Sequence, residues 1–106
     1  MVKILLCCSA GMSTSMVVQR MEKAAVQLGI DASIAAVGTE EFSEKIVDYD
    51  CCLLGPQIKY KLTDFQSCAG EYNKPVAVIN TMDYGMLNGE KILKSALSLI
   101  DSHRGA

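Results

Sequence analysis

The feature that most constrains the fold is a regular alternation of short apolar runs with longer amphipathic segments. The apolar runs predict four β-strands, at Val2–Cys7, Ile30–Val37, Cys51–Leu54 and Val76–Ile79. Apolar residues at helical spacing predict helices from Ser13 or Thr14 to Leu28, over a short stretch after Gly38-Thr39, over Lys59–Ala69, and from Asn88 onward. The remaining polar stretch, Asn80–Leu87, is predicted to be a loop. We therefore expect one β-α-β-α-β-α-β-α domain that spans residues 1–106.

This alternation is typical of an α/β three-layer sandwich, with a four-stranded parallel sheet and helices on both faces. Right-handed crossovers place all four strand-to-helix connections at the carboxyl edge of the sheet. With the strand order 2-1-3-4, the topological switch point lies between the first and third strands. The segment that follows Cys7 should then face Gly55-Pro56-Gln57 across this edge. The fold thus predicts a ligand site between these two connections.

Composition narrows the function classes. The chain has 106 residues, half of them hydrophobic, and a net charge of −2, which argues against nucleic acid or an anionic membrane as the main partner. No apolar run approaches the roughly 20 residues of a membrane-spanning helix. We expect a soluble, cytoplasmic, monomeric protein without cofactor or metal. Its five cysteines lack zinc-binding spacing, and four are expected to be reduced and mostly buried: Cys7, Cys51, Cys52 and Cys68.

The fifth cysteine, Cys8, lies where the first strand ends and a helix-capping segment begins. Small and hydroxylated residues follow it: Ser9, Ala10, Gly11, Met12, Ser13, Thr14 and Ser15. Backbone N–H groups at a helix N-terminus bind anions, and the same environment lowers the pKa of a thiol. Cys8 is therefore a candidate nucleophile, with the seven following residues as a phosphate cradle. The alternative is that this segment only caps the helix.

The spacing after Cys8 separates a phosphatase from a phosphoryl carrier. Cysteine-dependent tyrosine phosphatases carry Cys-x5-Arg-[Ser/Thr], in which the arginine stabilises the transition state. This chain has Thr14 at the arginine position, and the next cation, Arg20, is expected on the outer face of the helix. Its single histidine, His103, is expected at the opposite edge of the sheet, so a phosphoryl donor must be another molecule. The pattern favours a relay over a hydrolase.

Residues 8–15, with Leu54-Gly55-Pro56-Gln57-Ile58 and Tyr84-Gly85, resemble the enzyme IIB component of the bacterial phosphotransferase system, in its lactose/cellobiose/chitobiose family. The resemblance covers essentially the whole chain and implies a fold like that of low-molecular-weight tyrosine phosphatases. It also implies that Cys8 takes a phosphoryl group from a phosphohistidine of IIA and passes it to a sugar carried by the membrane protein IIC.

We expect partner contacts from a further set of residues, in which Met12 and Tyr84 are exposed: Met12, Gly55, Pro56, Gln57 and Tyr84. The competing hypothesis is a small cysteine phosphatase or an arsenate-reductase-like enzyme. The latter would need Cys51 or Cys52 as a resolving thiol. Asp83 could serve a phosphatase as a general acid, although a solvated loop residue is the simpler interpretation.

Overall fold

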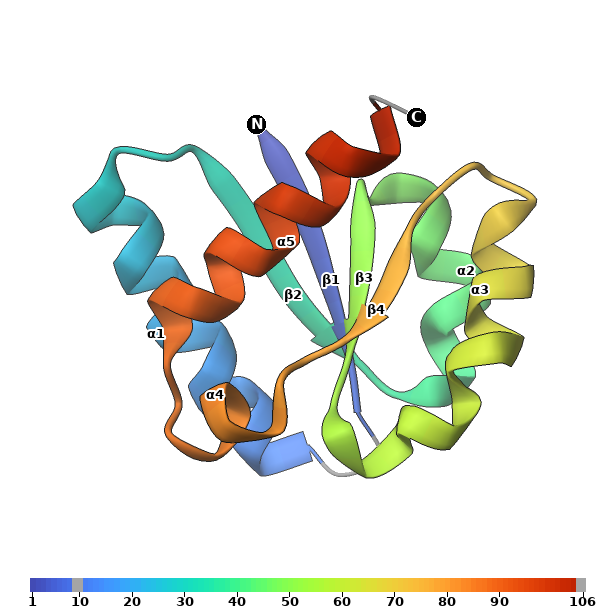
Figure 1. The fold of residues 1–106 in the computed structure, drawn as a ribbon, viewed down its shortest axis with the longest axis horizontal. Helices are drawn as coiled ribbons and strands as arrows, with labels where there is room; N and C mark the ends of the chain where they lie inside the picture. Colours follow the sequence, from blue (N-terminus) through green and yellow to red (C-terminus); the bar gives the residue numbers. More distant parts are fainter. Residues whose placement is uncertain (9–10, 105–106) are drawn as a thin grey trace.

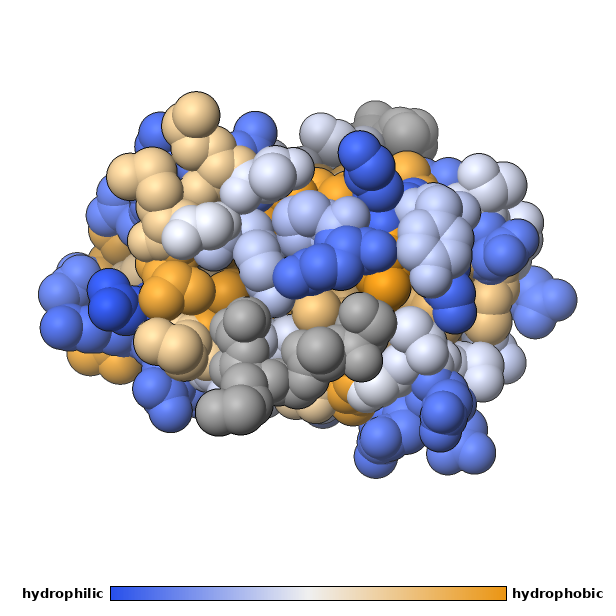
Figure 2. Space-filling view, turned by 90° about the horizontal axis from the view of Figure 1, so that it is seen from below, coloured by the Kyte–Doolittle hydropathy of each residue, from blue (hydrophilic) through white to orange (hydrophobic). Residues whose placement is uncertain are grey.

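The computed structural model describes residues 1–8 and 11–104, and for residues 11–13 and 104 only the backbone. Its sheet contains the strands β1 (Val2–Cys7), β2 (Ala32–Val37), β3 (Cys51–Leu54) and β4 (Val76–Val78). All pairs are parallel and the order is β2-β1-β3-β4, as predicted. In Figure 1 the four strands run downward, so that their carboxyl ends meet at the lower edge, which faces the viewer in Figure 2.

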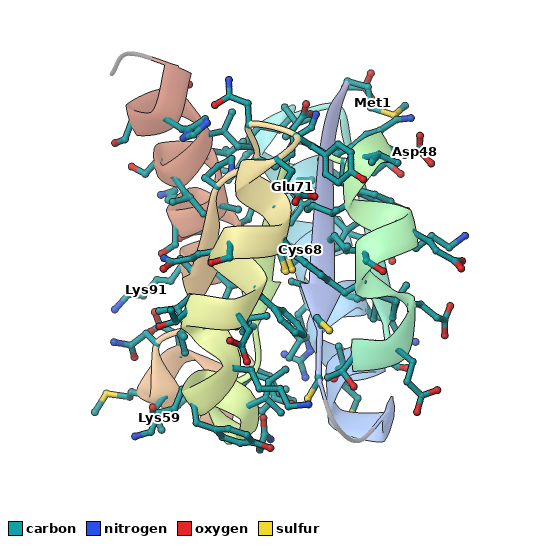
Figure 3. All side chains as sticks on the ribbon, turned by 90° about the vertical axis from the view of Figure 1, so that its right-hand side faces the viewer. Met1, Asp48, Lys59, Cys68, Glu71 and Lys91 are labelled. Atoms are coloured by element: carbon teal, nitrogen blue, oxygen red, sulfur yellow. The ribbon has the colours of Figure 1, made fainter. Side chains whose placement is uncertain are left out.

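Helices cover both faces of the sheet (Figure 1). One face carries α1 (Gly11–Leu28) and α5 (Gly89–Arg104), and the other carries α2 (Phe42–Lys45) and α3 (Leu62–Gly70). Short helical turns flank α2 and precede α3: η1 (Thr39–Glu41), η2 (Ile46–Asp48) and η3 (Pro56–Lys61). Figure 3 looks onto α3, with Met1 and Asp48 at the amino edge, Lys59 at the carboxyl edge and Cys68 about midway. The predicted three-layer architecture is confirmed.

Two apolar cores hold the layers together, because the side chains of a strand alternate between the faces of the sheet. Ile4 and Leu6 pack with Met21 of α1 and Leu93 of α5. On the other face, Leu5 and Cys7 pack with the helices that follow β2 and β3. There Phe42 stacks on Phe65, with the ring centroids 4.3 Å apart, and so joins α2 to α3. The central strand β1 is therefore fixed from both sides at the point where Cys8 follows it.

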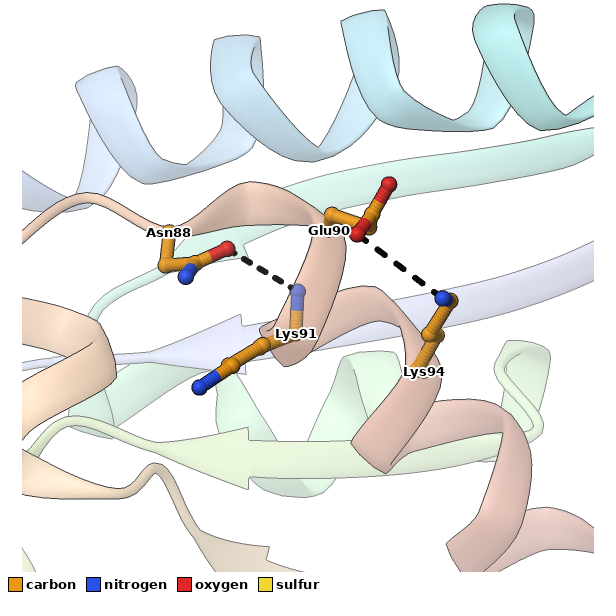
Figure 4. A network of polar contacts seen from close by, with 4 residues as sticks. All are labelled: Asn88, Glu90, Lys91 and Lys94. Carbon is orange, nitrogen blue, oxygen red and sulfur yellow. Dashed lines mark hydrogen bonds and ion pairs between the residues drawn. The ribbon is translucent and has the colours of Figure 1, made fainter.

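The helix ends show how local sequence sets the boundaries. Gly29 follows α1 with φ of 70°, the left-handed conformation that favours glycine after a helix. The side chain of Asn88 caps α5, as predicted, by accepting a hydrogen bond from the Lys91 backbone N–H at 3.2 Å. Glu90 and Lys94 form an exposed ion pair in the next turn (Figure 4).

Several predicted boundaries were wrong. The helix α1 begins at Gly11 rather than at Ser13 or Thr14, and β2 begins at Ala32 rather than Ile30. Pro56 starts η3, so helical turns begin three residues before the predicted Lys59, because proline suits the first turn of a helix. The predicted end of α1 at Leu28 is confirmed, and the Leu28 side chain there is 40% exposed.

The largest error concerns the predicted loop over Asn80–Leu87, which contains the helix α4 (Thr81–Gly85). The Asn80 side chain caps this helix by accepting hydrogen bonds from the backbone N–H groups of Met82 and Asp83, at 2.9 and 3.1 Å. Such a cap satisfies donors that have no partner inside a helix. In consequence the last strand is followed by an ordered helical turn at the carboxyl edge.

Candidate functional site

Cys8 follows the last residue of β1, at the carboxyl edge of the sheet and at the predicted switch point. Its side chain is buried, with 6% of its surface exposed. The backbone N–H of Gly55 donates to the Cys7 carbonyl oxygen at 2.9 Å, which ties the end of β3 to the end of β1. The side chain of Cys7 belongs to the core beneath α2 and α3, as predicted. Cys8 instead contacts Tyr84, which belongs to the core on the α1 and α5 side.

Among the described residues, side chains from two other elements contact the Cys8 sulfur. The Cys8 thiol donates to Gln57 Oε1 at 3.5 Å, and Tyr84 Oη lies 3.6 Å from Sγ. Gln57 comes from η3, after β3, and Tyr84 comes from α4, after β4. Residues that follow three neighbouring strands, β1, β3 and β4, thus meet at the Cys8 sulfur. This is expected for parallel strands, whose carboxyl ends share one edge of the sheet.

The close approach of η3 to the thiol requires glycine at position 55. A Cβ atom built on Gly55 would lie 2.7 Å from Gln57 Oε1 and 2.9 Å from Cys8 Sγ. Because Gly55 has φ of −62° and ψ of 147°, its backbone conformation is open to any residue. The glycine is therefore required by packing against the thiol and not by its φ angle.

Cys8 also lines a cavity of about 270 Å³. Cys8, Thr14 and Ser15 form one wall, and the end of β2 with η1 forms the other, through Ala36, Val37, Gly38 and Glu41. Thr14 is buried, at 3% exposed, whereas Ser15 is exposed. The cavity brings a sulfur nucleophile, two hydroxyl groups and the first turns of α1 together, a combination that suits a phosphoryl group.

The predicted cradle is covered by the structure in part. Ser9 and Ala10 lie outside the described residues. The backbone of Gly11, Met12 and Ser13 forms the first turn of α1, so an 18-residue helix begins three residues after Cys8. The helix N-terminus is the positive end of the helix dipole, as the sequence argument assumed. Thr14 and Ser15 complete the set, and both line the cavity.

The structure corrects the expectation that Tyr84 is exposed, because only 9% of its surface is accessible. The helix α4 turns its ring into the core and its hydroxyl toward Cys8. Sequence reasoning missed this contact because it treated Asn80–Leu87 as a loop. Asn80 itself was the available signal, since asparagine is a preferred N-cap residue. Among the other residues expected to contact partners, Gly55 is buried, Pro56 is half-buried and Gln57 is exposed. The expected exposure of Met12 concerns a side chain outside the described part of the structure.

The three other buried thiols are poor candidates for chemistry. Burial raises the pKa of Cys7 to about 11, with a smaller contribution from the neighbouring Cys8. Burial likewise raises the pKa of Cys51 to about 12 and that of Cys52 well above its usual value. All three therefore stay protonated near neutral pH, whereas the thiolate is the reactive form. Neither Cys51 nor Cys52, each 0% exposed, is placed to resolve an oxidised Cys8 by approach from solvent.

His103 lies where the sequence predicted, near the end of α5 and away from Cys8. Its Nε2 is 2.9 Å from the backbone carbonyl oxygen of Asn73, in the turn that precedes β4 at the amino edge. It cannot reach the thiol without unfolding α5. Among residues 1–8 and 11–104, no helix combines the length and the apolar character needed to cross a bilayer.

Fold and site together define a class: small α/β thiol proteins with the fold of low-molecular-weight tyrosine phosphatases. A family model described as "PTS system, Lactose/Cellobiose specific IIB subunit" matches residues 3–95, and the chain belongs to this family. It is thus a phosphotransferase component, of the kind that works with IIA and IIC partners.

Curated relatives agree with this assignment. The oligo-β-mannoside-specific EIIB component of Bacillus subtilis strain 168 is 44% identical over 100 residues, which cover 94% of this chain and 97% of that protein. The cellobiose-specific EIIB component of Lactococcus lactis subsp. lactis is 37% identical over 103 residues, with 92% and 95% covered.

Solved structures show the same similarity. The cellobiose-specific IIB component of Borrelia burgdorferi has a TM-score of 0.80 at 40% identity, and the match covers 96% of this chain and 94% of that one. The lactose-specific IIB domain of Streptococcus pneumoniae has a TM-score of 0.83 at 16% identity, over 92% and 96%, and so supports the fold alone.

Proposed function

We propose that Cys8 carries a phosphoryl group between a phosphohistidine of a IIA protein and a β-linked disaccharide held by a membrane IIC protein. The observation that carries the proposal is the position of the Cys8 sulfur. It lies at the switch point, beside a cavity lined by the hydroxyl residues Thr14 and Ser15 and next to the start of α1. The sugar class follows the names of the relatives, which include cellobiose- and oligo-β-mannoside-specific components.

The two transfers balance as simple displacements at phosphorus. In the first, the Cys8 thiolate attacks, an S–P bond forms, the N–P bond of the phosphohistidine breaks, and the imidazole leaves with the electron pair. In the second, a sugar hydroxyl attacks, an O–P bond forms and the S–P bond breaks. The hydroxyl proton then replaces the phosphoryl group on sulfur and restores the thiol. The first turns of α1 stabilise the phosphoryl oxygens in both steps.

Charge in the cavity supports a relay rather than a hydrolase. Among the described residues that line it, the only ionisable group besides Cys8 is Glu41, and no arginine or lysine is present. The carboxylate of Glu41 repels an anionic phosphoryl group and supplies none of the stabilisation that a cation would give. An arginine, the usual transition-state clamp of phosphatases, would be needed for efficient hydrolysis.

Partner contacts follow from the same edge of the sheet. We propose that Met12, Pro56 and Gln57 contact IIA or IIC, with Gly55 and Tyr84 behind them. Three exposed large side chains extend this surface: Tyr60 on η3, Met82 on α4, and Met86 directly after α4. Figure 2 looks onto this edge and shows apolar residues gathered at its left, over α1 and α4. We further propose that the protein acts in the cytoplasm as a monomer that docks transiently.

A reconstituted transfer assay tests the function. Sugar phosphate should form from phosphorylated IIA and cellobiose only when this chain and IIC-containing membranes are both present. Cys8→Ser should abolish it, and Cys68→Ser, which changes a half-buried cysteine on α3, should leave it intact. Steady hydrolysis of an aryl phosphate by the isolated chain, without transfer to sugar, would instead support the phosphatase hypothesis.

A further inference from the structure

Two of the contacts that the structure describes at the Cys8 sulfur differ in kind, because one group accepts a hydrogen bond and the other can donate one. Gln57 Oε1, at 3.5 Å, accepts from the thiol. Tyr84 Oη, at 3.6 Å, can serve as donor or acceptor. Since a thiol has a single proton and gives it to Gln57, the Tyr84 hydroxyl donates to the sulfur in this arrangement. In this arrangement the sulfur donates one hydrogen bond, to Gln57, and accepts one, from Tyr84.

When the Cys8 thiol loses its proton, the sulfur can only accept hydrogen bonds and needs donors around it. A thiolate has nothing to donate, so the contact with Gln57 Oε1 becomes a repulsion between an amide oxygen and an anion. The Gln57 side chain is exposed and can turn its amide, which presents the Nε2 donors instead. Tyr84 needs no such change, because its hydroxyl is already a donor. It is also held by packing, with its ring in the core between the sheet and α5.

We propose that Tyr84 and Gln57 form a hydrogen-bonding pair that follows the charge on Cys8. Tyr84 is the fixed donor that stabilises the thiolate, and Gln57 changes from acceptor to donor when the sulfur ionises. The Gln57 amide then also faces any phosphoryl group that the sulfur carries. This last statement rests on the proposed function, whereas the role in ionisation does not.

Alkylation of Cys8 tests the pair without any phosphoryl donor. The rate of reaction with iodoacetamide is measured against pH, and mass spectrometry of the peptide that contains Cys8 separates it from the other thiols. Tyr84→Phe removes the donor and keeps the ring, so the midpoint of the pH profile should rise by about one pH unit, since a hydrogen bond to a charged group is lost. Gln57→Glu replaces a potential donor with a carboxylate and should raise the midpoint further.

Matched controls remove the same groups elsewhere. Tyr72→Phe deletes a half-exposed hydroxyl in the turn after α3, and Gln27→Glu adds a negative charge near the end of α1. Neither should move the midpoint. Circular dichroism and the urea unfolding midpoint establish that each variant is folded. Should Tyr84→Phe fail to fold, Gln57→Glu, which changes an exposed side chain, still decides the question.

The outcomes separate this inference from the proposed function. If both Tyr84→Phe and Gln57→Glu leave the midpoint at its wild-type value, the pair does not sense the charge on sulfur and the inference is overturned. If the midpoint rises but the wild-type chain takes no phosphoryl group from IIA, the inference stands and the proposed function fails. If both hold, Tyr84→Phe should also slow phosphorylation about tenfold at a pH below the midpoint, where the thiolate fraction is limiting.

Discussion

Gly55→Ala should damage the site while leaving the fold nearly intact. The added Cβ would lie 2.9 Å from Cys8 Sγ and 2.7 Å from Gln57 Oε1. Gln57 can swing outward, but the sulfur sits on a short side chain and must move by about half an ångström to reach an ordinary contact distance. A displacement of about 1 Å costs roughly a hundredfold in a positioned reaction, so we expect about a tenfold loss of transfer rate.

The effect on stability should be small, because two contributions oppose each other. Alanine fits the extended backbone at position 55 and restricts the unfolded chain, which stabilises by about 0.4–1 kcal/mol. Crowding of the sulfur destabilises by about 1–2 kcal/mol. The net change in the free energy of unfolding should therefore be about 1 kcal/mol or less, measured by urea denaturation.

Two rates report the damage from Gly55→Ala: alkylation of Cys8 by iodoacetamide and phosphorylation by phosphorylated IIA. Gly70→Ala is the control, because a Cβ there, at the end of α3, meets no atom within 4 Å. It should keep both rates. A folded Gly55→Ala protein with wild-type rates would refute the argument that this glycine exists to admit the thiol.

Two further predictions concern the scaffold. A Cβ on Gly89 would meet the backbone of Arg20 and lie 2.6 Å from the Met21 nitrogen, so Gly89→Ala must push α5 away from α1. We expect the free energy of unfolding, measured in urea, to fall by about 2 kcal/mol. An unchanged urea midpoint would contradict this packing. Burial raises the pKa of Cys7 from 9.0 to about 11, so above pH 9 the unfolded chain loses this proton first and stability falls by about 2–3 kcal/mol up to pH 11. The free energy of unfolding of Cys7→Ala should decline less steeply than that of the wild type between pH 9 and 11, and the two should have the same slope below pH 9. Parallel curves over the whole range would show that Cys7 ionises normally in the folded protein.

Much of this architecture is encoded in local sequence patterns. The continuous apolar run of β3, Cys51–Leu54, is typical of a central parallel strand, and its bounds were predicted correctly. The alternation of strands and helices, with right-handed crossovers, then placed Cys8 and Gln57 at one edge. Burial of Cys7 followed from the alternation of side chains along a strand. These results depend only on period and chirality, which act over short stretches of chain.

Contacts that depend on tertiary packing were not predictable. Nothing in the period of Asn80–Leu87 indicates a five-residue helix, because too few residues are present to show a repeat. The cap at Asn80 is a local signal, but the burial of Tyr84 arises only where β4, α4 and α5 meet. Likewise Gly55 appeared to be only a strand terminator. Its packing against Cys8, 47 positions earlier in the chain, is visible only in three dimensions.

The central claim is that Cys8 itself holds the phosphoryl group. Intact-mass and peptide mass spectrometry after brief incubation with phosphorylated IIA test it most directly. We predict one phosphoryl group per chain, located on Cys8, and none on Cys8→Ser. A phosphoryl group on His103, or one that persists in Cys8→Ser, would contradict the account.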